Sequence, residues 1–218
     1  MSGAGTRTAV AAVTGVLLAA GACARSDRWS PETLGGAVVI PSVAEPALRL
    51  TDTRGHPYDF RAATRGRIAL LYFGYTHCPD VCPLQMANVA GALRRLPVRV
   101  RDQIAVVFVT VDSARDGPQR LRAWLDQFDS SFVGLTGSLA AINAYQAGTH
   151  VLAASAPQPD RHGGYTMGHS AAVLAFTRDD TAHVAFPAGV TPDGWVAGLR
   201  RLVRLGPPPV AMRPHPPG

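Results

Sequence analysis

Long, almost uninterrupted apolar runs mark the predicted strands of this chain. The runs are 67–73 (RIALLYF), 104–112 (IAVVFVTVD), 171–177 (AAVLAFT) and the shorter 183–187 (HVAFP). A strand with one face in water alternates apolar and polar residues, whereas a strand covered on both faces is apolar throughout. The runs therefore predict a central sheet that lies inside the protein.

Between these runs, apolar residues recur at helical spacing. The spacing predicts helices over 84–96, 118–128, around 139–145 and over 195–205. A short hairpin is predicted over 47–60 and a strand edge over 150–156. Strands that alternate with helices are typical of an α/β protein whose helices flank a central sheet. We therefore predict one α/β domain over 46–205, with the hairpin as its N-terminal extension.

The N-terminal segment has the pattern of an export signal. Its apolar stretch, residues 9–20, is shorter than the ~20 residues that span a bilayer and fits the ~7–15 residues of a signal-peptide core. Small residues directly before Cys23 resemble a bacterial lipobox. We therefore predict a signal peptide over 1–22, cleavage before Cys23 and lipidation of its thiol. Cleavage without lipidation and an uncleaved anchor are the alternatives, and each places the domain outside the cytoplasm.

Two further segments carry signals for irregular structure. Residues 23–45 are punctuated by Gly and Pro and are predicted to be a linker. Residues 206–218 (GPPPVAMRPHPPG) are too rich in proline for a regular element and are predicted to be a disordered tail.

Composition and charge narrow the functional classes. The chain has 218 residues, is 47% hydrophobic and carries 17% charged residues, which suits a folded domain with a sizeable core. Its formal net charge is +6, but the arginines are scattered rather than interleaved with aromatic residues in one basic block. This pattern disfavours nucleic-acid binding. It leaves open whether the basic surface steers the domain to an acidic partner or to anionic lipid headgroups.

Two of the three cysteines form the main candidate site. If Cys23 is lipidated, Cys78 and Cys82 remain as a pair at the end of a predicted strand and the start of a predicted helix. Open α/β sheets place their sites at such strand ends, and a helix N-terminus favours thiolate over thiol. The pair suits a disulfide, disulfide exchange or a soft metal. A bridge across so short a loop removes little chain entropy, so chemistry explains the pair better than a structural staple.

The motif FGYTHCPDVCP (73–83), followed in order by VFVTVDSARDGPQRLRAW, GLTG and GHS, resembles the Sco/SenC family of thioredoxin-fold copper proteins over residues 45–205. The resemblance implies a thioredoxin-like fold and copper binding by Cys78, Cys82 and His169. It also implies a membrane-tethered copper chaperone that helps to assemble the binuclear copper centre of cytochrome c oxidase. The implied partners are a periplasmic copper donor and the copper-binding subunit of the oxidase or another acceptor.

The chemistry of these three side chains agrees with copper. Two thiolates and one imidazole form a soft set of ligands suited to Cu(I), and Cu(II) can bind if a water or carboxylate joins them. Zinc would need a fourth ligand. Three ligands also leave an open side for transfer of the metal. Two positions depart from the family pattern, which usually has Asp where this chain has Gly168 and Pro where it has Ser113.

Two other functions are compatible with the cysteine pair. A thiol–disulfide oxidoreductase that keeps acceptor cysteines reduced would need Cys78 and Cys82 as a redox pair but not His169, and a peroxidase would need one low-pKa cysteine. Roles outside metal binding are predicted for the remaining candidates. His77 supports the site or faces solvent, and Asp112 supports the site or forms a turn. Asp80 starts the helix, Met86 lies in the core, and the surface carries His150, His162 and His183. Met167 remains an alternative accessory ligand.

Overall fold

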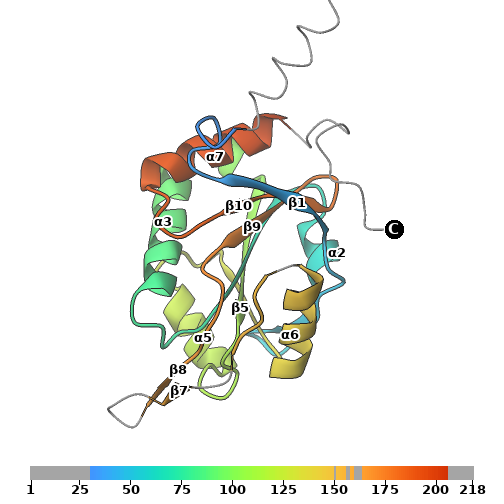
Figure 1. The fold of residues 1–218 in the computed structure, drawn as a ribbon, viewed down its shortest axis with the longest axis vertical. Coiled ribbons are helices and arrows are strands. Elements are labelled where there is room, and N and C mark those ends of the chain that lie inside the picture. Colours follow the sequence, from blue (N-terminus) through green and yellow to red (C-terminus); the bar gives the residue numbers. More distant parts are fainter. Residues whose placement is uncertain (1–29, 150, 156–157, 160–163, 206–218) are drawn as a thin grey trace, which may run out of the picture.

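An eight-stranded sheet forms the centre of the protein, with strand order β1-β10-β9-β4-β5-β6-β2-β3 (Figure 1). The computed structural model describes residues 30–149, 151–155, 158–159 and 164–205. The strands are β1 (Val38–Ala44), β2 (Arg49–Asp52), β3 (Pro57–Asp59), β4 (Ile68–Gly74), β5 (Ile104–Thr110), β6 (Val133–Thr136), β7 (Gln158–Pro159), β8 (Tyr165–Thr166), β9 (Val173–Thr177) and β10 (Thr181–Phe186). The helices are α2 (Phe60–Thr64), α3 (Val81–Arg95), α4 (Val98–Arg101), α5 (Pro118–Leu125), α6 (Leu139–Gly148) and α7 (Pro192–Leu205).

The long apolar runs form the middle of this sheet, as predicted. β4 and β5 are buried along their whole length and pair in parallel, from Ile68 opposite Ile104 to Gly74 opposite Thr110. β9 adds antiparallel to β4, and β10 adds antiparallel to β9. The predicted hairpin is β2–β3, which joins the far edge of the sheet through β6. The α/β prediction with a central sheet and an N-terminal hairpin is therefore confirmed.

The helices cover both faces of the sheet. In Figure 1, α3 and α5 lie to the left of the sheet, α2 and α6 to its right, and α7 runs along the top. The inner face of α7 carries Trp195, which stacks on Phe186 of β10 with ring centroids 4.1 Å apart. Leu199 and Leu202 on the same face are fully buried, and burial of each such side chain contributes about 1.5–3 kcal/mol. A Cβ at Gly198 would lie 2.5 Å from the carbonyl oxygen of Leu34, so only glycine lets α7 pack this closely.

The predicted linker is wrong over part of its length. Residues 38–44 form β1, the edge strand of the main sheet, paired antiparallel with β10. Pro41 concealed this strand, because proline lacks an N–H and is normally confined to edge strands and bulges. It lies between Val39 and Val43, where the register with β10 shifts. The buried Leu34 extends the fold further into the predicted linker.

Three other predictions differ from the structure. Residues 151–155 of the predicted strand edge contain no strand, because their backbone is tied to α6 by Val151 N–H donating to the Gln146 carbonyl and Ala154 N–H donating to the Gln146 side chain. No element was predicted over 131–137, which includes β6. His183 is buried rather than on the surface, and its Nε2 lies 2.9 Å from the Asp179 carboxylate.

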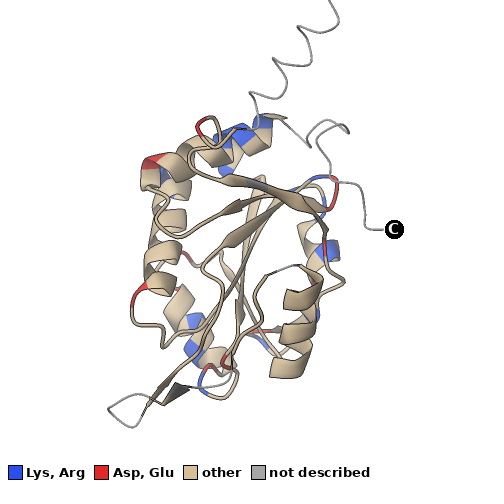
Figure 2. Cartoon of the chain, viewed as in Figure 1, with Lys and Arg blue, Asp and Glu red and all other residues tan. Residues whose placement is uncertain are grey.

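Several predictions concern residues beyond the described ranges. The signal peptide over 1–22, the lipidated Cys23, the tail over 206–218, His150 and His162 all lie outside the described residues. Within the described part of the chain, no helix has both the length and the apolar character needed to cross a bilayer. Figure 2 shows basic residues at several positions along α7.

Candidate metal centre

Cys78, Cys82 and His169 meet at one end of the sheet. The Nε2 atom of His169 lies 3.4 Å from the sulfur of Cys82 and 3.8 Å from the sulfur of Cys78. The three candidate ligand atoms all lie within 4.8 Å of one another. Both cysteines are free thiols; Cys82 is fully buried and Cys78 is 7% exposed. The structure thus brings together two sulfurs and one imidazole nitrogen, although Cys78 and His169 are 91 positions apart in the sequence.

The end of β4 and the start of α3 position the two cysteines. The side chain of Asp80 accepts a hydrogen bond from the backbone N–H of Val81 and caps α3, which confirms its predicted role at the start of the helix. Gly74, the last residue of β4, leaves room for Cys82, because a Cβ there would lie 2.9 Å from the Cys82 sulfur. Met86, one turn further along α3, is fully buried in the core as predicted.

The orientation of His169 is set by one hydrogen bond and two aromatic rings. Its Nδ1 lies 2.9 Å from the carbonyl oxygen of Ser170, so Nδ1–H donates there and Nε2 faces the sulfurs. The rings of Tyr72 and Tyr75 meet the imidazole edge to face, with centroids 6.1 and 5.5 Å away. These contacts present the nitrogen that a metal would need.

The two thiols differ in their tendency to lose a proton. A hydrogen bond from Cys82 lowers the pKa of Cys78 to about 4, and a hydrogen bond with His169 acts in the same direction against the effect of burial. Burial raises the pKa of Cys82, and the neighbouring Cys78 thiolate raises it further. Burial opposes a charge on His169, yet its hydrogen bond with Cys78 leaves its pKa raised. Cys78 is therefore the more acidic thiol of the pair, and Cys82 is the less acidic one.

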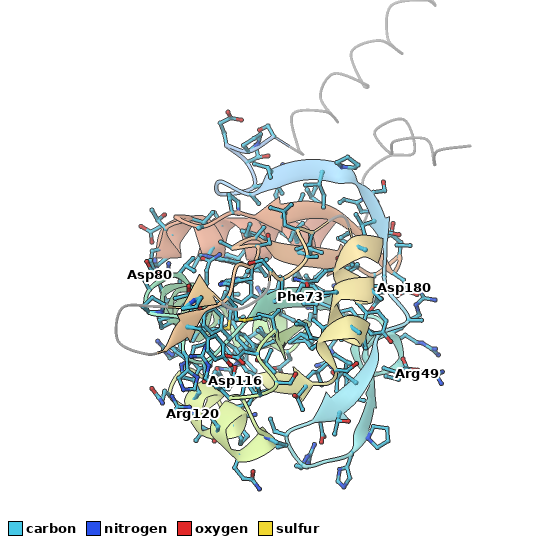
Figure 3. All side chains as sticks on the ribbon, turned by 60° about the horizontal axis from the view of Figure 1, so that its bottom comes forward. Arg49, Phe73, Asp80, Asp116, Arg120 and Asp180 are labelled. Carbon is cyan, nitrogen blue, oxygen red and sulfur yellow. The ribbon has the colours of Figure 1, made fainter. Side chains whose placement is uncertain are left out.

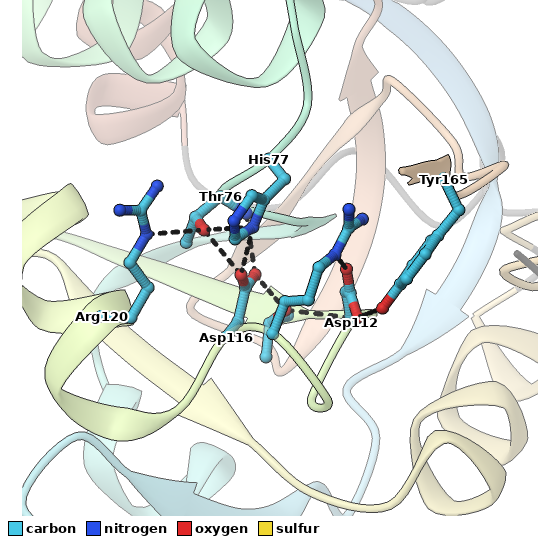
Figure 4. Close-up of polar contacts among 8 residues, drawn as sticks. Thr76, His77, Asp112, Asp116, Arg120 and Tyr165 are labelled. Atoms are coloured by element: carbon cyan, nitrogen blue, oxygen red, sulfur yellow. Dashed lines mark hydrogen bonds and ion pairs between the residues drawn. The ribbon is translucent and has the colours of Figure 1, made fainter. Parts of the chain in front are cut away.

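A buried carboxylate holds the turn that leads into Cys78 (Figure 4). Asp116 is fully buried and accepts hydrogen bonds from the Thr76 N–H (2.7 Å), the Thr76 hydroxyl (2.6 Å) and the Thr110 hydroxyl (2.6 Å). The Nδ1 atom of the half-exposed His77 lies 3.3 Å from the same carboxylate. His77 therefore supports the turn, which is one of the two roles predicted for it.

A second group of contacts holds the strand that precedes His169 (Figure 4). The hydroxyl of Tyr165 in β8 donates to Asp112 over 2.8 Å, and Nε of Arg115 lies 2.5 Å from the other oxygen of Asp112. The Arg115 guanidinium lies 3.5 Å from the centroid of the Tyr165 ring and 5.8 Å from that of Tyr75. Asp112 therefore has the supporting position predicted as one alternative.

Sequence reasoning missed Asp116, Arg115 and Tyr165. Figure 3 shows Asp116 and Asp80 on the same side of the molecule, with Arg120 close to Asp116. The run of polar residues after the buried strand β5 was the available signal, since strand ends of this sheet carry the site. Met167 is 6% exposed and packs in the hydrophobic core next to this region.

Comparisons of the sequence with known proteins find matches in one protein family. The profile of the SCO1/SenC family matches residues 41–204. The mouse (Mus musculus) protein named Protein SCO2 homolog, mitochondrial, is 29% identical over 157 residues, which cover 72% of this chain and 61% of the mouse protein. The chain thus matches less than two thirds of the length of that relative.

Solved structures of Sco proteins resemble the fold of this chain. The structure of Bradyrhizobium japonicum ScoI with copper bound is 32% identical, has a TM-score of 0.64, and the match covers 73% of this chain and 99% of that chain. BsSco, a member of the Sco family of cytochrome c oxidase assembly proteins in which a disulfide switch was identified, is 17% identical with a TM-score of 0.57; the match covers 77% of this chain and 98% of that chain. At this identity BsSco shows the fold alone. The predicted thioredoxin-like arrangement is confirmed by these likenesses.

Proposed function

The chain belongs to the SCO1/SenC family, and from this premise we propose that it is a copper chaperone whose ligands are Cys78, Cys82 and His169. The observation that carries the proposal is the meeting of two sulfurs and one imidazole nitrogen within 4.8 Å. Thiolates select soft metals, and imidazole suits copper as well. The copper-bound relative from Bradyrhizobium supports copper as the metal.

The placement of the ligands suits a metal that is carried rather than kept. Cys82 is fully buried, whereas Cys78 is slightly exposed and His169 is only partly buried. Copper held by three side chains near the surface can accept a fourth ligand from a partner, and exchange of ligands can then pass it on. Either Cu(I) or Cu(II) is compatible with the ligand set, the latter with an added water or carboxylate.

We assign the copper chaperone a role in the assembly of cytochrome c oxidase. The family resemblance of FGYTHCPDVCP supports this assignment. The proposed partners are a periplasmic copper donor and the copper-binding subunit of the oxidase or a similar acceptor. The proposed location is the extracytoplasmic face of the cell membrane, where a lipid on Cys23, or an uncleaved anchor, holds the domain.

One observation favours a second candidate function. The low pKa of Cys78, about 4, beside the raised pKa of Cys82 is also the arrangement of a redox pair, in which the thiolate attacks a disulfide and its neighbour resolves the mixed disulfide. A thiol–disulfide oxidoreductase that reduces the cysteines of a copper acceptor would use this chemistry. It would consume one dithiol per turnover and need an external reductant.

A transfer experiment separates the two functions. The full chain is loaded with Cu(I) and mixed with the copper domain of an oxidase subunit whose cysteines have already been reduced, and the copper in the separated acceptor is measured. A chaperone transfers copper to this acceptor, and Cys78→Ser and Cys82→Ser variants do not. An oxidoreductase without a chaperone role leaves the acceptor without copper, yet reduces an oxidised acceptor even as a His169→Ala variant.

A further inference from the structure

The outer side of α7 carries a depression lined by arginines, far from the metal centre in the fold. Its volume is about 350 Å³, and it is lined by Thr33, Ala197, Arg200, Arg201 and Arg204. We call it the α7 arginine pocket. Arg200 and Arg204 are exposed, and Arg201 is half-buried. Nothing in the copper chemistry uses these side chains.

Within the described ranges, no acidic side chain balances the positive charges of the pocket. No carboxylate of the described residues forms an ion pair with Arg200, Arg201 or Arg204. The Nε of Arg201 is buried and lacks a hydrogen-bond partner among those residues. Glu32, the sequence neighbour of Thr33, forms hydrogen bonds with Ser30 and with its own backbone. Three guanidinium groups that lack a carboxylate partner among the described residues favour a ligand that carries oxygen atoms and negative charge.

The pocket lies where the chain comes from its proposed tether. Only six residues separate Cys23 from Ser30, the first described residue. Each residue spans at most about 3.6 Å, so Ser30 stays within roughly 25 Å of a lipid on Cys23. Thr33, three residues further on, already lines the pocket. A membrane that holds Cys23 is therefore within reach of these arginines.

We propose that the α7 arginine pocket binds the phosphate of an anionic phospholipid headgroup and holds the domain with one end against the membrane. The proposal rests on the tether at Cys23 that forms part of the proposed function. Guanidinium groups recognise phosphate through paired N–H donors, and basic segments next to a membrane are attracted to its anionic lipids.

This binding would turn the metal centre away from the bilayer. α3 begins beside Cys82, and near its other end Arg95 pairs with Asp193 of α7 over 2.5 Å. A helix of 15 residues is about 22 Å long, so α7 meets α3 at the end of α3 that lies away from Cys82. Figure 2 shows the arginines of α7 at the end of the molecule opposite the β7–β8 hairpin that leads to His169. Copper partners could then approach from the aqueous side.

The test uses the full lipidated chain with vesicles of neutral phosphatidylcholine, or with vesicles that also contain phosphatidylglycerol. Hydrogen exchange is measured over residues 192–205, for the wild type, for Arg200→Gln with Arg204→Gln, and for Arg49→Gln with Arg54→Gln. The last pair removes the same charge from the β2–β3 hairpin, whose two arginines are largely exposed. We expect anionic vesicles to slow exchange in α7 at least three-fold in the wild type and the hairpin variant, but not in the α7 variant.

Three results would overturn the proposal: equal protection in neutral vesicles, equal loss of protection in the hairpin variant, or the same protection from millimolar inorganic phosphate with neutral vesicles. The tether is checked separately by flotation with neutral vesicles. If the chain does not float with neutral vesicles but binds anionic vesicles through Arg200 and Arg204, lipid binding by the pocket is supported and the lipid tether at Cys23 is contradicted. Copper content should be unchanged in the α7 variant, so a failed pocket leaves the chaperone proposal intact.

Discussion

Ser155 and Gly168 hold each other through two hydrogen bonds and leave no space for a side chain at position 168. The Gly168 N–H donates to the Ser155 hydroxyl over 3.1 Å, and the Ser155 N–H donates to the Gly168 carbonyl over 3.0 Å. A Cβ at position 168 would lie 2.2 Å from the Ser155 hydroxyl oxygen. The contact ties the segment after α6 to the residue before His169, and Ser155 occupies the space that the usual Asp of the family would need.

We predict that Gly168→Ala and Ser155→Ala weaken copper binding through the same contact. Each change breaks the bond between the hydroxyl and the Gly168 N–H, which is worth about 0.5–1.5 kcal/mol, or roughly a 2- to 12-fold change in affinity if it acts fully on His169. Competition titration of copper into the single and double variants measures the coupling. Because one contact is lost either way, the second change should cost little once the first is present. Fully additive effects would show that Ser155 and Gly168 act independently.

Asp116→Asn should destabilise the protein and loosen the turn before Cys78. The carboxylate accepts from the Thr76 N–H and from the Thr76 and Thr110 hydroxyls while fully buried. An amide keeps the shape but turns one acceptor into a donor that faces other donors, which costs about 1–3 kcal/mol. Urea unfolding measures the loss. Asp102→Asn is the matched control, because the Asp102 side chain is 65% exposed; an equal loss in the control would remove the special role of Asp116.

Cys78 should react as a thiolate well below neutral pH. Its pKa is lowered to about 4, first by the hydrogen bond from Cys82 and also by the hydrogen bond with His169. The rate of alkylation of Cys78 should therefore stay nearly constant from about pH 8 to 5, whereas an ordinary thiol with a pKa of about 8.5 loses roughly ten-fold per pH unit over that range. Peptide mass spectrometry after timed alkylation measures the rate at Cys78 separately from the rate at the other cysteines.

The same alkylation experiment on a Cys82→Ala variant tests the cause of the lowered pKa of Cys78. The substitution removes the largest cause of the lowered pKa, so the alkylation profile of Cys78 should move toward that of an ordinary thiol. A wild-type profile that already falls ten-fold per unit below pH 8 would contradict the assigned protonation of the pair.

The central strands and the cysteine pair could be predicted because their signals are local. β4 and β5 are apolar at nearly every position, and the N-cap Asp80 lies between the two cysteines in the sequence. β1 escaped prediction because Pro41 interrupts it, and β6 because it is only four residues long and contains Gly134, whose Cβ would collide with Leu121 and Leu125 of α5.

The supporting contacts of the site could not be read from local pattern. Asp116 binds Thr76, which is 40 residues away, and Tyr165 binds Asp112 across 53 residues. Only the folded sheet brings these pairs together. His183 misled for a similar reason: its burial is compensated by Asp179, a partner that hydropathy does not reveal. The position of His169 came from the family resemblance, and the fold explains it by placing β9 beside β4.

The most direct test of the account is copper binding by the reduced full chain and its His169→Ala variant, with His56→Ala as control. His56 is exposed on the β2–β3 hairpin, so its loss changes the number of histidines without touching the site. We predict one copper per chain for the wild type and for His56→Ala, with thiolate-to-Cu(II) charge-transfer absorption, and binding at least about ten-fold weaker with an altered spectrum for His169→Ala. Full copper affinity and an unchanged spectrum in His169→Ala would contradict a site made by Cys78, Cys82 and His169.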